Sequence, residues 1–140
     1  MNQPFWARIH GGATHFPIAL LMVSVVFDHA GCWWREELRR REFRAFGFYS
    51  LLIAAAAAPF AVISGIGLSK GILLGSGLLA LHHYFIWPAF GLLIGLAAWR
   101  LVIRERASPR ARRCYLALAT LALGAMMSAA FWGGEMSIGK

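Results

Sequence analysis

The stretch FPIALLMVSVVFDHAGCWW, residues 16–34, decides the fold. Its length matches the roughly 20 apolar residues that a helix needs to cross the hydrocarbon core of a bilayer. Three further apolar stretches of similar length follow at residues 45–68, 81–103 and 114–132. Short connections between them leave no room for a soluble domain. We therefore predict an all-α integral membrane protein, a single four-span domain over residues 1–140 that forms an up-down-up-down four-helix bundle.

The composition supports the same class. Of the 140 residues, 59% are hydrophobic and only 14% are charged, which is too little polar surface for an ordinary soluble domain. The net charge of +8 does not indicate nucleic-acid binding, because the arginines gather in two short runs beside apolar segments. We interpret these runs as topology signals, the alternative being a basic patch that docks a partner.

The distribution of basic residues predicts the orientation. The first and third loops carry five arginines each: Arg35, Arg39, Arg40, Arg41 and Arg44, then Arg104, Arg106, Arg110, Arg112 and Arg113. The N-terminal segment, the second loop and the tail together carry only Arg8, Lys70 and Lys140. Since positively charged loops stay in the cytoplasm, both termini and the second loop are expected on the non-cytoplasmic side.

Prolines and glycines predict the helix boundaries. Pro17 is expected in the opening turn of the first span, where its missing N–H costs nothing. Pro109 is expected as a turn residue in the third loop, and Gly133 with Gly134 should end the fourth helix.

Four of the five histidines, His10, His15, His82 and His83, are expected at the same outer surface. The first and third helices run parallel in the predicted bundle, so His15 and the His82–His83 pair should lie at the same depth. Two facing imidazoles there would clamp a haem iron or hold a metal ion. The alternative is that these side chains only hydrogen-bond to headgroups, water and backbone.

Helical periodicity selects between the adjacent histidines. Taking Gly91, Gly95 and Ala98 as the face that meets neighbouring helices, His83 lies nearer to that face than His82 does. His83 is thus the expected inward ligand and His82 its replacement. Arg100 is expected to snorkel to the headgroups.

Asp28 and His29 interrupt the inner end of the first span. A carboxylate in a membrane span is costly unless it is paired, so Asp28 is expected to pair with His29 or with an arginine of the first loop. Helix–helix hydrogen bonding is the simplest interpretation of both residues, and a proton or quinone site is the alternative.

Familiar catalytic motifs are absent, so the chain is not expected to be an enzyme by itself. It has no CxxCH or CxxC, no phosphate-binding glycine loop and no nucleophile elbow. Hydrolysis by a zinc-bound water needs three protein ligands, which the outer histidines can supply. His10 and Glu135 are the weaker metal-ligand candidates.

Residues 9–31, IHGGATHFPIALLMVSVVFDHAG, resemble a bacterial domain-of-unknown-function family of short four-span membrane proteins. The hallmark of that family is a His-Phe-Pro-Ile-Ala-Leu opening of the first helix, found here from His15. Other matching positions are His10, Asp28, Ser64, Gly65, one of His82 and His83, and the Gly-Gly-Glu ending at Glu135. The resemblance implies the bacterial inner membrane with periplasmic termini, and periplasmic cytochromes and dehydrogenases as partners.

These observations predict a small membrane subunit of a respiratory or dehydrogenase complex with one haem b near the periplasmic face. His15 and His83 would be the axial ligands, and Arg8 or Lys70 would pair with the propionates. Electrons would pass between a periplasmic donor and either quinone or a larger membrane or periplasmic redox protein. The second hypothesis is a cofactor-free accessory subunit whose small-residue helices help a larger complex to assemble.

The orientation can be tested by cysteine labelling in sealed cells, in a background without Cys32 and Cys114. An impermeant maleimide should label Ser76→Cys and Ser137→Cys but not Ser108→Cys, because only the first two lie outside. Labelling of Ser108→Cys would place His10, His15, His82 and His83 on the cytoplasmic side and exclude a periplasmic electron donor.

Overall fold

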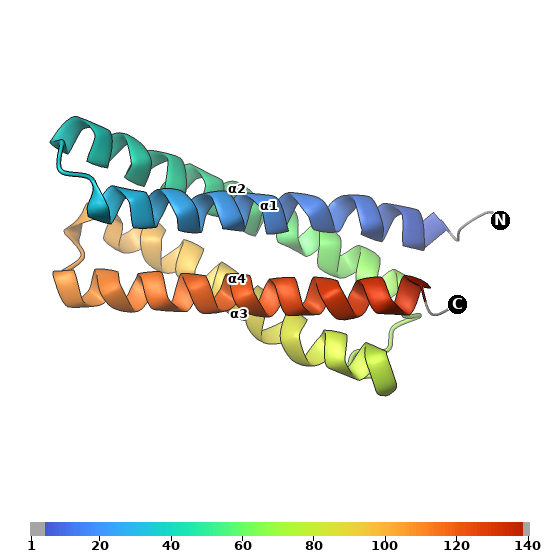
Figure 1. Ribbon diagram of the computed structural model, residues 1–140. Coiled ribbons are helices and arrows are strands. Elements are labelled where there is room, and N and C mark those ends of the chain that lie inside the picture. Colours follow the sequence, from blue (N-terminus) through green and yellow to red (C-terminus); the bar gives the residue numbers. More distant parts are fainter. Residues whose placement is uncertain (1–4, 139–140) are drawn as a thin grey trace.

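The computed structural model describes residues 5–138, apart from the side chain of Glu105. Over this range the chain forms helices α1 (Phe5–Trp33), α2 (Glu37–Leu68), α3 (Gly77–Ile103) and α4 (Pro109–Ile138), with a short 3-10 helix η1 (Arg104–Arg106) before α4. Consecutive helices run antiparallel, so the two chain ends and the α2–α3 loop lie at one end of the bundle (Figure 1). The described residues include no strand. The predicted all-α, up-down-up-down four-helix bundle is confirmed.

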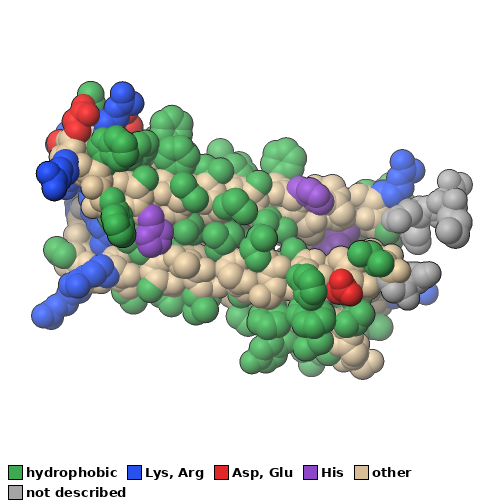
Figure 2. All heavy atoms as spheres, in the orientation of Figure 1, with side chains coloured by type: hydrophobic (Ala, Val, Ile, Leu, Met, Phe, Trp, Pro, Cys, Tyr) green, Lys and Arg blue, Asp and Glu red, His purple; other side chains and the backbone are tan. Residues whose placement is uncertain are grey.

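All four helices are long and apolar enough to cross a membrane. They contain 27 to 32 residues, or about 40 to 48 Å at 1.5 Å per residue, which exceeds a hydrocarbon core of about 30 Å. Large apolar side chains cover the middle of the bundle and point outward (Figure 2): Phe16 is 68% exposed and Phe46 is 59% exposed. In a bilayer these side chains contact lipid instead of water. The helix ends extend into the headgroup regions.

Each helix begins earlier than expected, and α4 also ends later. α1 begins at Phe5, so Pro17 lies inside the helix and the prediction that it occupies the opening turn was wrong. α4 continues through Gly133 and Gly134 to Ile138, so the prediction that these glycines end it was also wrong. Pro109 is the first residue of α4, a position where proline loses no hydrogen bond.

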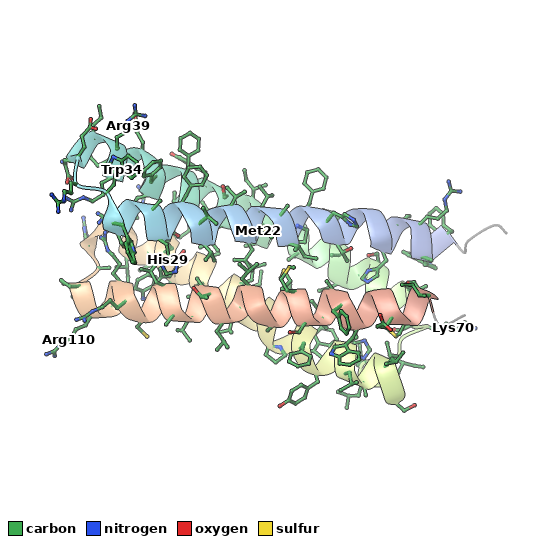
Figure 3. The ribbon with its side chains drawn as sticks, viewed as in Figure 1. Met22, His29, Trp34, Arg39, Lys70 and Arg110 are labelled. Carbon is green, nitrogen blue, oxygen red and sulfur yellow. The ribbon has the colours of Figure 1, made fainter. Side chains whose placement is uncertain are left out.

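Charged residues extend α2 beyond the apolar segment. Glu37 lies 3.1 Å from Arg40 and 3.0 Å from Arg41, ion pairs one helical turn apart that stabilise a solvated helix end. The polar run that was expected to be a loop is therefore the first turns of a helix. Arg39 and Arg110 lie at this end of the bundle and Lys70 at the opposite end (Figure 3). Lys140, the third basic residue assigned to the outer side, is outside the described residues.

The bundle consists of two helical hairpins. α1 packs most extensively on α2, and α3 on α4, while α1 against α4 and α2 against α3 close the ring. Small residues of α2 permit the close approach of α1: the Asp28 carboxylate lies against Gly47, and the Trp6 ring lies against Gly67. Ala54, Ala58 and Ala61 continue the buried face of α2.

Small residues on α3 do not serve the same purpose. Gly91 and Gly95 are exposed, and a Cβ atom added to either would meet no atom within 4 Å. Our assignment of this face to helix contacts within the chain was therefore wrong. The buried face of α3 carries Ala89, Leu93 and Arg100.

The glycines of the two surfaces provide a matched test of packing. A Cβ at Gly47 would lie 2.7 Å from Cγ of Asp28, so Gly47→Ala should destabilise the protein by about 1 to 3 kcal/mol through overpacking. Gly91→Ala should be neutral or slightly stabilising, because alanine favours helix where space is open. Unfolding in mixed detergent micelles measures both variants, and equal stabilities would contradict the α1–α2 contact described above.

Candidate functional site

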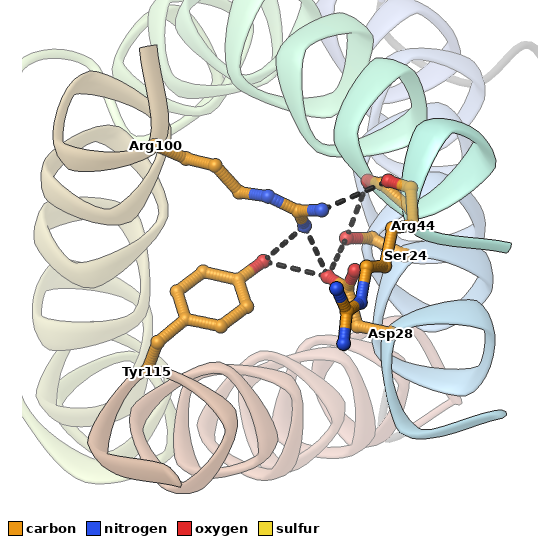
Figure 4. A network of polar contacts seen from close by, with 6 residues as sticks. Ser24, Asp28, Arg44, Arg100 and Tyr115 are labelled. Atoms are coloured by element: carbon orange, nitrogen blue, oxygen red, sulfur yellow. Dashed lines mark hydrogen bonds and ion pairs between the residues drawn. The ribbon is translucent and has the colours of Figure 1, made fainter. Parts of the chain in front are cut away.

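A buried ion pair lies near the end of the bundle that carries the α1–α2 and α3–α4 connections. Asp28 of α1 and Arg100 of α3 form a salt bridge across the bundle, and both are almost fully buried, with 4% and 7% of their side-chain surface exposed. The Tyr115 hydroxyl of α4 donates to Asp28 Oδ2 at 2.8 Å, and Arg100 Nη1 donates to that hydroxyl oxygen at 2.9 Å (Figure 4). Each charged group thus has several partners in the interior.

Backbone groups of α2 complete this network. Arg100 Nη2 donates to the Arg44 carbonyl at 2.9 Å, and Ser24 Oγ donates to the Gly47 carbonyl at 2.8 Å (Figure 4). The guanidinium of Arg100 also lies 5.6 Å from the centroid of the Phe48 ring, within the range of a cation–π contact. The network therefore connects all four helices. Its full set of partners favours a structural role, because a carboxylate that binds a ligand or a proton needs a free face.

One prediction about this region was wrong. Arg100 does not snorkel to the headgroups but points into the bundle, because Asp28 is there to pair with it. Arg100 was not among the partners expected for Asp28, which were His29 and the arginines of the first loop. His29 makes its own contact between helices, from Nε2 to Thr120 Oγ1 at 3.1 Å. The predicted use of both residues in helix–helix hydrogen bonding holds.

Histidines cluster at the opposite end of the bundle, which carries the two chain ends and the α2–α3 loop. The His10 ring of α1 and the His82 ring of α3 have centroids 6.4 Å apart, and the His83 ring follows at 5.6 Å from His82. His10 and His82 are half-buried, and His83 is buried. We refer to His10, His82 and His83 as the histidine cluster. It joins two helices that are not neighbours in sequence.

Main-chain carbonyls orient all three rings in the same way. His10 Nδ1 lies 3.1 Å from the Ala61 carbonyl, His82 Nδ1 lies 2.8 Å from the Ala129 carbonyl, and His83 Nδ1 lies 3.0 Å from the Leu74 carbonyl. A carbonyl only accepts, so Nδ1 of His82 and Nδ1 of His83 must carry the proton when the ring is neutral. His10 Nδ1 also lies 3.0 Å from Ser64 Oγ, and its contact with the Ala61 carbonyl favours the same tautomer. Each Nε2 then presents a lone pair. This is the arrangement in which proteins hold histidine ligands of metals.

Glycines of the neighbouring helices and carbonyl groups of the α2–α3 loop lie against these rings. A Cβ at Gly65 would lie 2.9 Å from Cε1 of His10, and one at Gly133 would lie 3.4 Å from Nδ1 of His82. The α2–α3 loop folds back along α3, where its Leu74 carbonyl bonds His83 and its Leu73 carbonyl accepts from Trp87 Nε1 at 2.8 Å. Gly65 and Gly133 therefore leave space for the rings of His10 and His82, and Ser64 Oγ lies 3.0 Å from His10 Nδ1.

The other predicted site residues lie outside the cluster. His15 is exposed on α1, five residues deeper than His10, and ligation of a haem by His15 and His83 stays a prediction. Arg8, Lys70 and Glu135 are exposed at the same end as the cluster. Among the described residues, no group of three or more His, Cys, Asp or Glu side chains is arranged to hold a metal ion. The three-ligand zinc site therefore has no candidate in this part of the chain.

A double-mutant cycle tests the buried pair. Asp28→Leu alone and Arg100→Leu alone should each lower stability by about 3 to 5 kcal/mol, because the other member of the pair is left as an uncompensated buried charge. Asp28→Leu combined with Arg100→Leu should lose much less, since both charges are removed. Unfolding in mixed micelles gives all the values, and a double variant as unstable as the sum of its single variants would refute the pairing.

Comparisons with known proteins agree with the fold. Neither the curated proteins nor the solved structures compared with the chain gave a match. The model of the family described as "Predicted membrane protein (DUF2231)" matches residues 7–140, which covers all four helices except the first residues of α1. The expected domain-of-unknown-function family of short four-span membrane proteins is thereby confirmed. The chain belongs to the predicted membrane protein family DUF2231.

Proposed function

We propose that this membrane protein is a small electron-transfer subunit of a respiratory or dehydrogenase complex, with the histidine cluster as its cofactor site. The observation that carries the proposal is the common orientation of three imidazoles at one end of the bundle. Each Nδ1 is held by a backbone carbonyl, and each Nε2 lone pair is left for a ligand. Histidines that serve packing alone have no need of one shared tautomer.

A b-type haem fits this donor set. When bound, it would supply reversible one-electron transfer, for which paired imidazole ligands are suited. His10 and His82 are the pair that we favour, because their rings meet edge to face between α1 and α3, with centroids 6.4 Å apart. His83 would support the site from the α2–α3 loop. Arg8 and Lys70, both exposed at this end, are suited to hold propionate groups through charge-assisted hydrogen bonds.

The partners would be larger redox proteins. Residues 5–138 form only helices and short connections, so an electron donor has to approach the end of the bundle from outside the membrane. The arginine distribution favours the periplasmic face of a bacterial inner membrane as the location of the histidine cluster. A periplasmic cytochrome or dehydrogenase is the partner that this orientation favours.

A second candidate function rests on the exposed glycines of α3. Gly91 and Gly95 have open space beside them and lie on the surface, spaced one helical turn apart. Such a face lets another transmembrane helix approach closely. It supports a cofactor-free accessory subunit that fits against helices of a larger complex.

An absorption spectrum distinguishes these functions. Protein purified in mild detergent from haem-replete cells should show a haem spectrum that sharpens on dithionite reduction. His10→Ala or His82→Ala should abolish it, because each removes one axial ligand. His15→Ala is the matched control on the same helix and should leave it unchanged, whereas ligation by His15 would reverse this order.

Other results would favour the accessory role. Intact protein whose pyridine extract contains no haem would refute the cofactor proposal. If, in addition, Gly91→Leu and Gly95→Leu prevented co-purification of a larger complex while the histidine variants did not, the accessory function would replace it.

A further inference from the structure

The loop between α2 and α3 carries an apolar surface where a solvated loop would be polar. Residues 69–76 join the two helices, and three consecutive side chains in the middle of this loop, Ile72, Leu73 and Leu74, are 50%, 52% and 73% exposed. Lys70, the charged residue of the loop, lies near its beginning. Apolar side chains that gather on a surface in this way indicate contact with an apolar environment outside the protein.

This surface continues the lipid-facing side of α3. Leu78, Leu81 and Tyr84, in the first turns of α3, are also exposed, and large apolar side chains gather around this part of the bundle (Figure 2). Since α3 is long and apolar enough to span a membrane, these side chains contact lipid. The loop and the beginning of α3 therefore present one apolar face.

Side chains of α3 hold the loop against that helix. Trp87 Nε1 donates to the Leu73 carbonyl at 2.8 Å, and His83 Nδ1 lies 3.0 Å from the Leu74 carbonyl. Carbonyls that face water have no need of these donors, because water itself supplies the hydrogen bond. Within a membrane the same carbonyls would lack a partner, which makes the two donors necessary.

Other polar groups of the loop backbone are also bonded within the chain. The N–H groups of residues 69–72 donate to the carbonyls of residues 65, 67, 66 and 69 at 2.9 to 3.3 Å. Ser69 Oγ lies 2.9 Å from the Ile72 carbonyl, the shorter of its two carbonyl contacts. The three residues with exposed apolar side chains thus each have a side-chain donor at their carbonyl. A loop that enters the apolar edge of a membrane has to satisfy its backbone in this way.

We propose that the α2–α3 loop inserts Ile72, Leu73 and Leu74 into the lipid leaflet at this end of the bundle, at the boundary between headgroups and acyl chains. Aromatic side chains such as Trp87 favour this depth, because the ring is apolar and the N–H polar. Lys70 lies at the end of the bundle (Figure 3), where its ammonium group reaches the headgroups and water. The partner of this surface is lipid acyl chain.

Insertion would fasten the ends of α2 and α3 at a weak contact of the bundle. α2 packs far less on α3 than on α1, so the loop and its bonds to His83 and Trp87 strengthen the junction. The Leu74 carbonyl also orients the His83 ring of the histidine cluster. The proposal is independent of whether that cluster binds a cofactor, because it concerns only the position of the loop relative to lipid.

Spin-label accessibility in a bilayer tests the proposal. The full-length protein without its native cysteines is reconstituted in vesicles of phosphatidylcholine and phosphatidylglycerol, with one nitroxide at Ile72→Cys or Leu74→Cys. Oxygen concentrates in lipid and a nickel chelate stays in water, so power saturation should show both labels to be more accessible to oxygen. Ser76→Cys, exposed at the end of the same loop, is the control and should show the opposite preference.

A pair of tryptophan variants tests the hydrogen bonds. Trp87→Phe keeps an aromatic ring but removes the N–H that bonds the Leu73 carbonyl, so the label at Leu74→Cys should shift towards nickel accessibility. Trp132→Phe, near the same end of the bundle on α4, is the matched control and should leave the label unchanged.

Preference of the labels at Ile72→Cys and Leu74→Cys for the nickel chelate would overturn the proposal, because the loop would then lie in water. Low accessibility to both reagents would also overturn it, since protein, such as a second copy of the chain, would then cover the surface. An equal response of the two tryptophan variants would count against a loop held in lipid by the Trp87 bond. The labels in the parent background decide the position of the loop even if Trp87→Phe does not fold.

Discussion

A carboxylate within hydrocarbon has to meet a cation, and Asp28 meets Arg100 across the centre of the bundle. The pair joins α1 to α3, two helices on opposite corners of the ring, and Tyr115 adds α4 to the same group of atoms. A shift of any one of these helices along its axis would separate the charges. The Ala-rich core has little capacity to set this register, because small apolar side chains pack in several offsets with similar energy. The polar network therefore selects one arrangement of the four helices.

The histidine cluster depends on that register. His10 and His82 come from the same two helices as Asp28 and Arg100, but from their outer ends. Their rings face each other only if α1 and α3 keep a fixed offset along their length. The small residues Gly65 and Gly133 then give the rings space beside α2 and α4. The ion pair thus fixes the alignment of the helices, and the histidine cluster at the opposite end of the bundle depends on that alignment.

Much of the architecture could be predicted from the sequence, because lipid imposes a simple rule on length and polarity. Four apolar runs and two arginine-rich loops lead directly to four antiparallel spans with both termini on one side. The helix ends were harder to predict, since the pairs of Glu37 with Arg40 and Arg41 continue α2 beyond the apolar run. A hydropathy profile detects only the apolar part of a helix, so it does not show where the helix ends beyond the hydrocarbon core.

The site could be predicted only as a group of residues at one end. Gathering four histidines at one surface followed from topology, but the partner of His82 depends on how α1 and α3 are rotated about their axes. The rotation of α3 was inferred from Gly91 and Gly95, which face outward. The burial of Asp28 and Arg100 offered a better guide, because two opposite charges at similar depth in different spans must face each other. Counting seven residues back from Arg100, two helical turns, reaches the buried Leu93 and identifies the inward face of α3.

The division of the bundle into two hairpins has a consequence for its biogenesis. The ribosome completes α1 and α2 well before it reaches Arg100, so the first hairpin enters the bilayer with the Asp28 carboxylate lacking its cation. The second hairpin likewise enters the bilayer with the Arg100 guanidinium lacking the Asp28 carboxylate. Each half is therefore poorly tolerated alone by the surrounding lipid, and docking of the halves neutralises both. The ion pair in this way makes completion of the whole chain the condition for a stable product.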